Sequence, residues 1–134
     1  MLIKEITLNE ALPIRHVAMW PDKDLDFVRV PGDDQATHLG LFVDRKLISV
    51  VSIFKKADGA QFRKFATLPN YQGRGYGSKL LVYMIGFAQK QNLSRIWCNA
   101  RASKVDFYSN FGLSTTNKTF EKSGLEYVVM EREL

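Results

Sequence analysis

Three glycines alternate with other residues in the segment Gln72-Gly73-Arg74-Gly75-Tyr76-Gly77-Ser78-Lys79. It comes after a strand-like run that stops at Pro69 and before a run of apolar residues at helical spacing. Glycine lets the backbone bend sharply and approach a ligand closely. The first N–H groups of a helix have no partner inside the helix and favour an anion. The sequence therefore predicts a pyrophosphate-binding turn with added charge from Arg74 and Lys79; a flexible glycine turn is the alternative on this segment alone.

Two other phosphate-binding patterns do not fit this segment. A Walker loop ends in Gly-Lys-Ser/Thr, whereas here Lys79 follows Ser78. The dinucleotide fingerprint is Gly-x-Gly-x-x-Gly after an early strand of a parallel repeat, whereas here the glycines follow several strands of a meander. Both classes of nucleotide-binding domain are therefore excluded.

The hydropathy pattern predicts an α+β domain over residues 1–134, in the order β-α-β-β-β-α-β-α-β-β. A first helix is expected to be capped by Asn9 and to end at Trp20-Pro21, and residues 21–36 are expected to form a loop. The other expected helices cover 76–88 and 102–111, and the expected strands cover 2–8, 38–43, 47–54, 60–68, 94–100, 113–120 and 125–132.

Composition narrows the function classes. Hydrophobic residues at 46% and charged residues at 25% are typical of a globular domain. We expect no membrane span and no signal peptide, hence a cytoplasmic location. Cys98 is the only cysteine, which excludes an internal disulfide and a cysteine-based zinc site, and we expect no metal. The net charge of +5 suits a polyanionic ligand or simple solubility. A nucleic-acid partner is not expected, because no helix-turn-helix, zinc or aromatic sheet signature is present.

Two segments of the sequence resemble motifs of a known enzyme family. Gln72-x-x-Gly75-x-Gly77 resembles the GNAT acetyltransferase signature Arg/Gln-x-x-Gly-x-Gly/Ala. The segment from Ala100 to Leu113 resembles a second family element, Ala-Arg-x-x-Ala-x-x-Phe-Tyr-x-x-x-Gly-Phe, with Lys104 in place of an alanine and Leu113 in place of the final Phe. The resemblance implies a mixed, mostly antiparallel sheet flanked by helices, with acetyl-CoA (coenzyme A) between strands 60–68 and 94–100.

The resemblance also implies which residues bind the cofactor. The backbone of one strand is expected to pair with the pantetheine arm and orient the thioester, and the glycine turn is expected to hold the pyrophosphate. The implied cofactor-binding residues are Phe65, Ala66, Thr67, Gln72, Gly73, Arg74, Gly75, Tyr76, Gly77, Ser78, Lys79, Arg101 and Lys104.

Tyr108 is the candidate general acid. The coenzyme A thiolate that leaves when an amine attacks the thioester must gain a proton. A phenol with a pKa near ~10 can supply it to a thiolate with a pKa near ~8.5. The alternative is a structural tyrosine whose hydroxyl is satisfied inside the fold.

Candidates for the base and for amine binding are weaker. His38 has a suitable intrinsic pKa and resembles the histidine of a GNAT subgroup, but a structural histidine is the competing interpretation. Glu121 and Glu126 are further candidates, against an ordinary solvated surface. Residues 119–130 resemble the ending of that subgroup at Phe120, Gly124 and Met130, and depart from it at Lys122, Glu126 and Tyr127. The acidic stretch 22–34 either attracts a cationic amine or is a solvated loop.

These observations predict an N-acetyltransferase that passes acetyl directly to an amine in a ternary complex. Cys98, Trp20 and Trp97 are expected in the core, with no acetyl-cysteine step. The acceptor is a small-molecule or peptide amine, and a homodimer through the C-terminal strands is possible by resemblance. A non-catalytic module that senses coenzyme A or acetyl-CoA is the main alternative, and turnover of an amine panel discriminates between the two.

Overall fold

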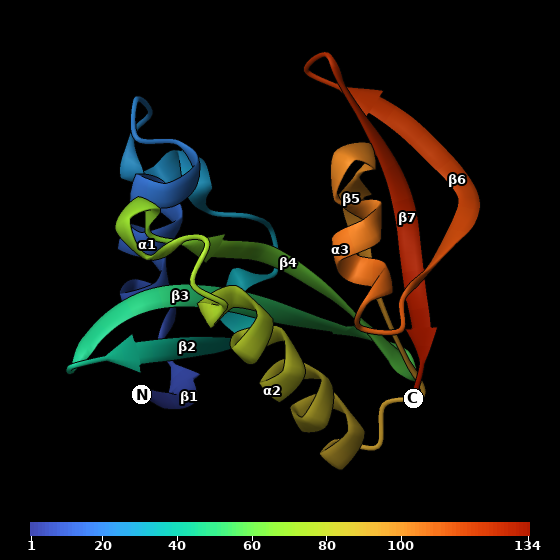
Figure 1. Cartoon of the computed structure of the whole chain (residues 1–134), viewed down its shortest axis with the longest axis horizontal. Helices are drawn as coiled ribbons and strands as arrows, with labels where there is room; N and C mark the ends of the chain where they lie inside the picture. The colour runs from blue at the N-terminus through green and yellow to red at the C-terminus, as the bar shows by residue number, and fades with distance from the viewer.

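A single seven-stranded sheet organises the computed structural model, which describes residues 1–134 (Figure 1). The strand order is β1-β2-β3-β4-β5-β7-β6, and every neighbouring pair is antiparallel except β4 with β5. This confirms the predicted mixed, mostly antiparallel sheet. The strands are β1 Leu2–Ile6, β2 Thr37–Val43, β3 Lys46–Lys56, β4 Gly59–Thr67, β5 Arg95–Arg101, β6 Ser114–Lys122 and β7 Leu125–Glu133; the α-helices are α1 Leu8–Met19, α2 Tyr76–Lys90 and α3 Val105–Ser109.

The start of α1 differs from the prediction because Thr7, not Asn9, is its N-cap. The Thr7 hydroxyl accepts a hydrogen bond from the Glu10 N–H at 3.1 Å, and Glu10 Oε1 accepts one from the Thr7 N–H at 2.9 Å. This reciprocal pair is a capping box, which satisfies two N–H groups at once. Strand β1 therefore ends at Ile6, two residues earlier than predicted.

Helices α1 and α2 cover opposite faces of the sheet. Side chains along β3 alternate: Val50 packs in one cluster with Ala11 and Ile14 of α1, whereas Val51 packs in the larger cluster that contains Leu80 of α2. The larger cluster also takes in β5 and β7, and α3 contacts β5 and β6. The helices therefore flank the sheet on both faces, as the family resemblance implied.

The two central strands pair over only part of their length. Strands β4 and β5 are in register from Gly59 with Arg95 to Gln61 with Trp97, and no further. Beyond Gln61 the strands run in different directions, so the sheet is split there into two diverging halves (Figure 1). The backbone of the later part of β4 is therefore not paired with β5.

A bulge changes the direction of the side chains along β4. Ser52 of β3 is opposite Arg63 and Val50 is opposite Ala66, so Val51 faces two residues, Lys64 and Phe65. Lys64 has φ of 56°, in the left-handed region that side chains rarely occupy. As a result Phe62 packs with the α2 cluster and Ala66 with the α1 cluster, although residues four apart in a regular strand face the same way.

The remaining differences from the prediction are local. Residues 21–36 contain two 3-10 helices, Leu25–Val28 and Asp33–Gln35, instead of a plain loop. The predicted helix 102–111 is a 3-10 turn, Ala102–Lys104, followed by the short α3. None of the helices has both the length and the apolar character needed to span a bilayer.

Candidate active site

The cleft lies where β4 and β5 diverge. It has a volume of about 990 Å³ and is lined by the end of α1, the second half of β4, the glycine turn, the end of β5, α3 and one residue of β7. Segments from six parts of the chain therefore meet at the split in the sheet. The predicted cofactor segment 65–67 and the predicted acid Tyr108 both line it.

The glycine turn presents an open helix end to this cleft. Gly75 is the N-cap of α2 with φ of 83°, and Gly73 has φ of 75°. A Cβ at either glycine would meet no atom within 4 Å, so the left-handed backbone, rather than crowding, favours glycine at both positions. No side chain caps the helix, and its first turn contains no acidic residue. These free N–H groups fit an anionic group such as a pyrophosphate.

Gln72 attaches the turn to the end of β4. Its side-chain amide donates a hydrogen bond to the carbonyl of Thr67 at 2.9 Å. The Thr67 hydroxyl is in turn 2.8 Å from the hydroxyl of Ser49 on β3. The predicted phosphate-binding turn and the predicted pantetheine-binding strand are thus held together by side chains.

The charged residues of the turn lie beside the cleft rather than inside it. The Arg74 guanidinium is 5.7 Å from the Tyr71 ring centre, and the Lys79 ammonium is 5.9 Å from the Tyr76 ring centre. Neither residue lines the cleft, whereas Tyr76, Gly77 and Ser78 do. Lys79 borders a smaller surface cavity next to β1. Both cations are therefore near the helix N-terminus without closing over it.

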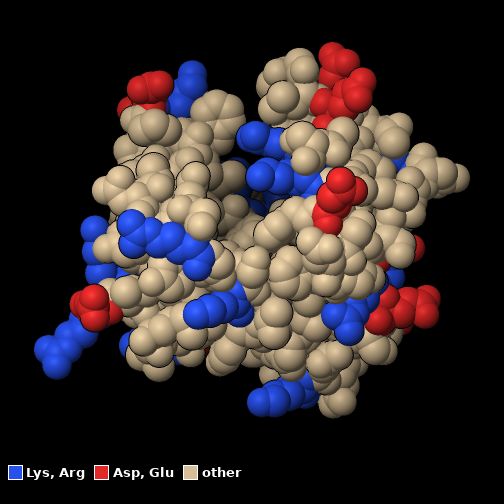
Figure 2. All heavy atoms as spheres, in the orientation of Figure 1, with Lys and Arg blue, Asp and Glu red and all other residues tan.

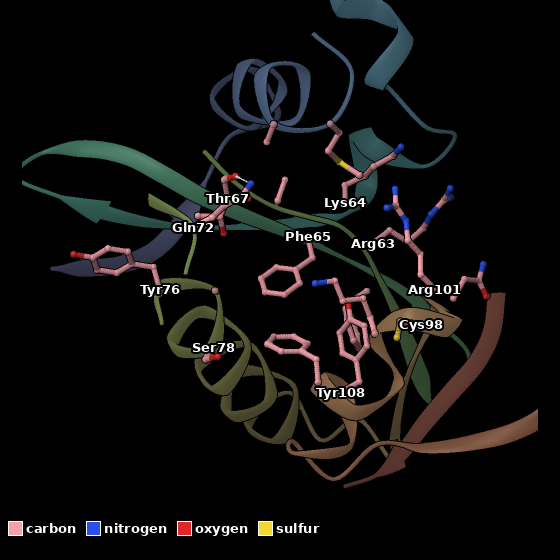
Figure 3. Close-up of a pocket in the computed structure, with 18 of the residues that line it drawn as sticks. Arg63, Lys64, Phe65, Thr67, Gln72, Tyr76, Ser78, Cys98, Arg101 and Tyr108 are labelled. Atoms are coloured by element: carbon pink, nitrogen blue, oxygen red, sulfur yellow. Dashed lines mark hydrogen bonds between the residues drawn. The ribbon is translucent and has the colours of Figure 1, made fainter. Parts of the chain in front are cut away.

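Tyr108 is half-buried and faces the cleft from α3 (Figure 3). Its ring packs against Phe62 and Phe107 at 5.9 and 5.2 Å between ring centres. The only fully buried side-chain nitrogen or oxygen without a partner is Arg15 Nε. The Tyr108 hydroxyl, which has no hydrogen bond within the protein, is therefore open to the cleft. This argues against the alternative of a structurally satisfied tyrosine.

Burial raises the pKa of two residues that line the cleft, Tyr108 and Cys98. It raises the pKa of Tyr108 above the ordinary phenol value; the nearby Cys98 thiol raises it further, and the charge of Arg101 opposes the change. Burial also raises the pKa of Cys98 to about 12. At neutral pH both groups therefore keep their protons.

A family model described as an acetyltransferase (GNAT) domain matches residues 26–134. The chain belongs to the GNAT family of acetyltransferases. The Bacillus subtilis (strain 168) protein "Uncharacterized N-acetyltransferase YitI" is 26% identical to it over 142 residues, which cover 98% of this chain and 95% of that relative. The resemblance inferred from the two motifs is therefore confirmed.

Solved structures show the same fold. A putative N-acetyltransferase from Lactobacillus plantarum has a TM-score of 0.86 at 19% identity, with 100% of this chain and 99% of that chain covered. A Bacillus subtilis acetyltransferase in complex with CoA has a TM-score of 0.76 at 16% identity, with 98% and 97% covered. GNAT acetyltransferases use acetyl-CoA as the acetyl donor, so this chain is an acetyl-CoA-dependent N-acetyltransferase.

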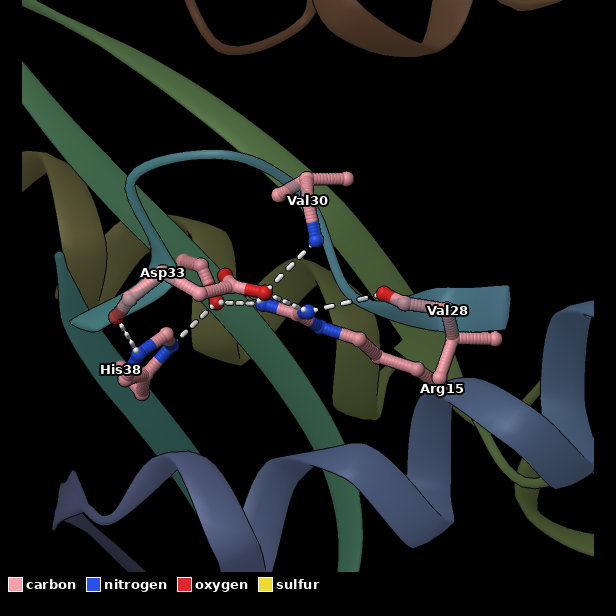
Figure 4. A network of polar contacts seen from close by, with 6 residues as sticks. Arg15, Val28, Val30, Asp33 and His38 are labelled. Atoms are coloured by element: carbon pink, nitrogen blue, oxygen red, sulfur yellow. Dashed lines mark hydrogen bonds and ion pairs between the residues drawn. The ribbon is translucent and has the colours of Figure 1, made fainter. Parts of the chain in front are cut away.

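In this GNAT enzyme His38 lies in a buried network away from the cleft (Figure 4). Its Nδ1 is 2.6 Å from the Ser52 hydroxyl and its Nε2 is 3.0 Å from the carbonyl oxygen of Asp33. Arg15 donates to both carboxylate oxygens of Asp33 at 2.8 Å. Both ring nitrogens of His38 are thus engaged, which matches the structural interpretation and gives no support to a role as base.

The two glutamates of the tail are also outside the cleft. Glu121 and Glu126 are exposed and directly opposite each other near the turn between β6 and β7. Tyr127, one of the departures from the GNAT subgroup, does line the cleft, and its ring stacks on Phe120 at 5.1 Å between ring centres. The position of Tyr127, rather than the glutamates, connects the C-terminal hairpin to the active site.

Arg101 and Lys104 both line the cleft, as the motif implied. Other residues that line it were not predicted from the sequence. Trp20 was expected in the core but is 39% exposed; it packs edge-on against Phe27 at 5.2 Å between ring centres. Trp97 is half-buried on β5 rather than in the core. The unselected lining residues are Ala18, Met19, Trp20, Phe62, Arg63, Lys64, Tyr71, Cys98, Asn99, Phe107 and Tyr127. A sequence signal existed for two of them, since the basic pair Arg63-Lys64 stands between Phe62 and Phe65 in a predicted strand.

Proposed function

We propose that the enzyme passes the acetyl group of acetyl-CoA directly to the amine of a small molecule or peptide, with both substrates bound in the cleft. The observation that carries this is the unpartnered Tyr108 hydroxyl in the same cleft as the uncapped N-terminus of α2. The N-terminus of α2 suits the phosphates, and the Tyr108 hydroxyl suits the leaving group. The part of β4 that does not pair with β5 runs between them.

Acetyl-CoA supplies an activated acyl group on a thioester and a thiolate leaving group. In the proposal the N–H groups of Tyr76, Gly77 and Ser78 at the start of α2 bind the pyrophosphate. The backbone of Phe65, Ala66 and Thr67 pairs with the pantetheine arm and fixes the direction of the thioester. Gln72, Gly73, Gly75 and Lys104 complete the proposed cofactor-binding set, while Arg74 and Lys79 add positive potential from outside the cleft. Arg101, which the family resemblance assigned to the cofactor, is not part of this set, because it lies on the opposite side of Phe65 and Tyr108 from the glycine turn (Figure 3).

Tyr108 acts in this proposal as the general acid that protonates the departing sulfur. Its raised pKa means that the phenol keeps its proton throughout the neutral and mildly alkaline range. A water-poor cleft also disfavours a free thiolate, which favours transfer of the Tyr108 proton to the leaving sulfur. Positioned acids of this kind contribute roughly 10²–10⁴-fold to rate.

Direct transfer is favoured over an acetyl-cysteine step because Cys98 is a poor nucleophile in this position. The thiol is 3% exposed, and its pKa of about 12 leaves almost no thiolate at neutral pH. The structure contains no side chain hydrogen-bonded to it that could act as its base. Much of the rate is then expected from the orientation of the two reactants.

Two measurements on the purified protein test the proposed function. Calorimetry should detect binding of coenzyme A, and that binding should weaken when Gly75 is replaced by a residue that resists positive φ, as in Gly75→Val. Release of free thiol from acetyl-CoA should depend on an added amine. Binding without turnover of any amine would favour the sensing module, and no binding at all would overturn the cofactor site.

A further inference from the structure

The charged side chains that line the cleft are all positive, which opposes the binding of a protonated amine by charge alone. No Asp or Glu lines it, whereas Arg63, Lys64, Arg101 and Lys104 do. Blue Lys and Arg atoms are accordingly visible inside the hollow between the two lobes in Figure 2. The acidic stretch 22–34 does not compensate, because none of its residues reaches the cleft.

Three of the four cations lie away from the phosphate-binding turn. Figure 3 shows Arg63, Lys64 and Arg101 together on one side of Phe65 and Tyr108, with Gln72, Tyr76 and Ser78 on the other side. In the proposed function the phosphates lie at the start of α2 and the reacting sulfur lies beside Tyr108. The side with Arg63, Lys64 and Arg101 is therefore where an acceptor enters, and we call these three residues the acceptor-side cations.

The bulge places Lys64 in this group. Its left-handed backbone and the two-for-one pairing with Val51 are what turn the side chain out of the regular alternation of β4. Such strained positions are kept where the surroundings over-determine them, often at functional sites. Arg63 comes from the same bulge, and Arg101 comes from the end of β5, on the other half of the split sheet.

The charges around Lys64 are mostly of its own sign. Burial lowers the pKa of its ammonium, and the nearby charges of Arg63, Arg15 and Lys122 lower it further; only Asp33 opposes them. Asp33 is itself occupied by the bidentate pair with Arg15. None of the three acceptor-side cations forms an ion pair within the protein, since the salt bridges present involve Arg15, Arg29 and Arg95. Clustered cations without a carboxylate are stabilised by a bound anion.

We propose that the acceptor is an anionic amine, that is, an amine whose molecule also carries a carboxylate or a phosphate, which the acceptor-side cations bind. The guanidinium groups of Arg63 and Arg101 suit planar or bidentate recognition of such a group, and Lys64 adds a point charge. This inference rests on the proposed acetyl transfer and narrows its substrate class. Polyamines and other purely cationic amines are disfavoured by repulsion.

Matched pairs of acceptors test the charge requirement directly. Lysine and cadaverine share an amine and differ in the carboxylate, whereas glucosamine 6-phosphate and glucosamine differ in the phosphate. In at least one pair, the member with the acidic group should have a kcat/KM at least about tenfold higher. A hydrogen bond to a charged group is strong enough to produce a ratio of that order. The pair with the larger ratio identifies which anion the site takes. Equal rates within both pairs, or faster turnover of cadaverine and glucosamine, overturn the inference while leaving the acetyltransferase function intact.

Substitutions test whether the acceptor-side cations cause the preference for an acidic group. Lys64→Gln and Arg63→Gln should each lower kcat/KM about tenfold for the acceptor that carries the acidic group. The kcat/KM for the matched amine without that group, and the KM for acetyl-CoA, should change little. Lys64→Glu should shift the preference towards the cationic amine. Lys118→Gln is the matched control, because it removes one lysine charge from an exposed position on β6 outside the cleft. An equal loss in the control overturns the assignment.

A binding measurement tests this inference without requiring turnover. Calorimetry with glucosamine 6-phosphate and with lysine, each added to the protein saturated with coenzyme A, should give binding for the compound whose acidic group the site prefers. That binding should weaken with added salt and in Lys64→Gln. If no amine is turned over, this measurement still decides the question, since no binding of either compound overturns the inference.

Discussion

Gly77 at the start of α2 lies directly against the ring of Phe65 on β4. A Cβ on residue 77 would be 3.1 Å from Phe65 Cζ, closer than ordinary van der Waals contact. The Phe65 ring stacks with Phe107 at 6.2 Å between ring centres, and Phe107 packs edge-on against Tyr108 at 5.2 Å. The third glycine of the turn therefore sets the position of a row of aromatic rings that leads from the phosphate-binding turn to the proposed acid.

Replacing Gly77 should affect cofactor binding more than stability. In Gly77→Ala the new methyl group is expected to displace the Phe65 ring and raise the Kd for coenzyme A, because the ring borders the cleft. Gly86→Ala is the control: residue 86 is inside α2 and its Cβ would meet nothing within 4 Å. That variant should gain about 0.5–1 kcal/mol in the free energy of unfolding and keep its Kd. Calorimetry and urea denaturation measure the two effects. Identical behaviour of the two variants would contradict the assigned role of Gly77.

Removal of the Tyr108 hydroxyl should slow the chemical step. Tyr108→Phe keeps the ring contacts with Phe62 and Phe107 and is expected to lower kcat by about 10²-fold or more, with a nearly unchanged KM for acetyl-CoA. Thiol release at pH 7 measures this. An unchanged kcat would show that another group or water protonates the sulfur.

The pH profile carries a second signature of Tyr108. Because burial raises its pKa above ~10, the acid form persists throughout the mildly alkaline range. In the native enzyme kcat should therefore not fall between pH 7 and about pH 9.5 through loss of this proton. It should instead rise or level off as the amine loses its own proton. A falling alkaline limb that disappears in Tyr108→Phe would contradict the raised pKa.

Cys98 should not carry the acetyl group. Protein mixed with acetyl-CoA in the absence of an amine should show no gain of one acetyl group at Cys98 by mass spectrometry, because the thiol is buried and protonated. Cys98→Ala should keep kcat within a few-fold while losing roughly 1–2 kcal/mol of stability from the smaller side chain. Detection of acetyl-Cys98 that an added amine discharges would refute direct transfer.

The pair of Arg15 and Asp33 should dominate the stability of residues 25–35. The arginine is fully buried, and the carboxylate is 5% exposed. Asp33→Asn leaves the buried guanidinium without a counter-charge and should cost about 3–5 kcal/mol at pH 7. Asp34→Asn, next to it and exposed, should change stability by less than about 0.5 kcal/mol. Urea denaturation of the two variants makes the comparison.

The same pair predicts how stability responds to acid. Burial alone raises the pKa of Asp33, but hydrogen bonds from Arg15 and the Val30 N–H, with the charge of Arg15, outweigh burial and hold the pKa below its usual value. A lowered folded-state pKa means that the stabilisation is complete above the unfolded pKa of ~3.9 and is lost as the pH falls through the folded value. The native protein should lose stability below about pH 4 more steeply than Asp33→Asn.

The chemistry and most of the elements could be predicted from the sequence because they depend on local patterns. The spacing of Gly73, Gly75 and Gly77 before a helical period is enough to indicate an anion-binding turn, and its backbone angles agree. The pair Phe107-Tyr108 was placed on a short helix after the fifth strand, where it is found. The errors were small and local, such as the N-cap at Thr7, where the Glu three residues later was the missed signal.

Tertiary structure alone decided which side chains meet in the cleft. The bulge at Lys64 reverses the alternation that the sequence of β4 implies, and Trp20 leaves the expected core for the cleft wall. His38, a weak candidate base for which the structural interpretation was the stronger one, is engaged by Ser52 and Asp33. The physical reason is that pairing between distant strands sets the direction of each side chain, and one extra residue in one strand inverts it. Residue types and spacing thus determine what the turn and the tyrosine can do, whereas the divergence of β4 from β5 determines what they face.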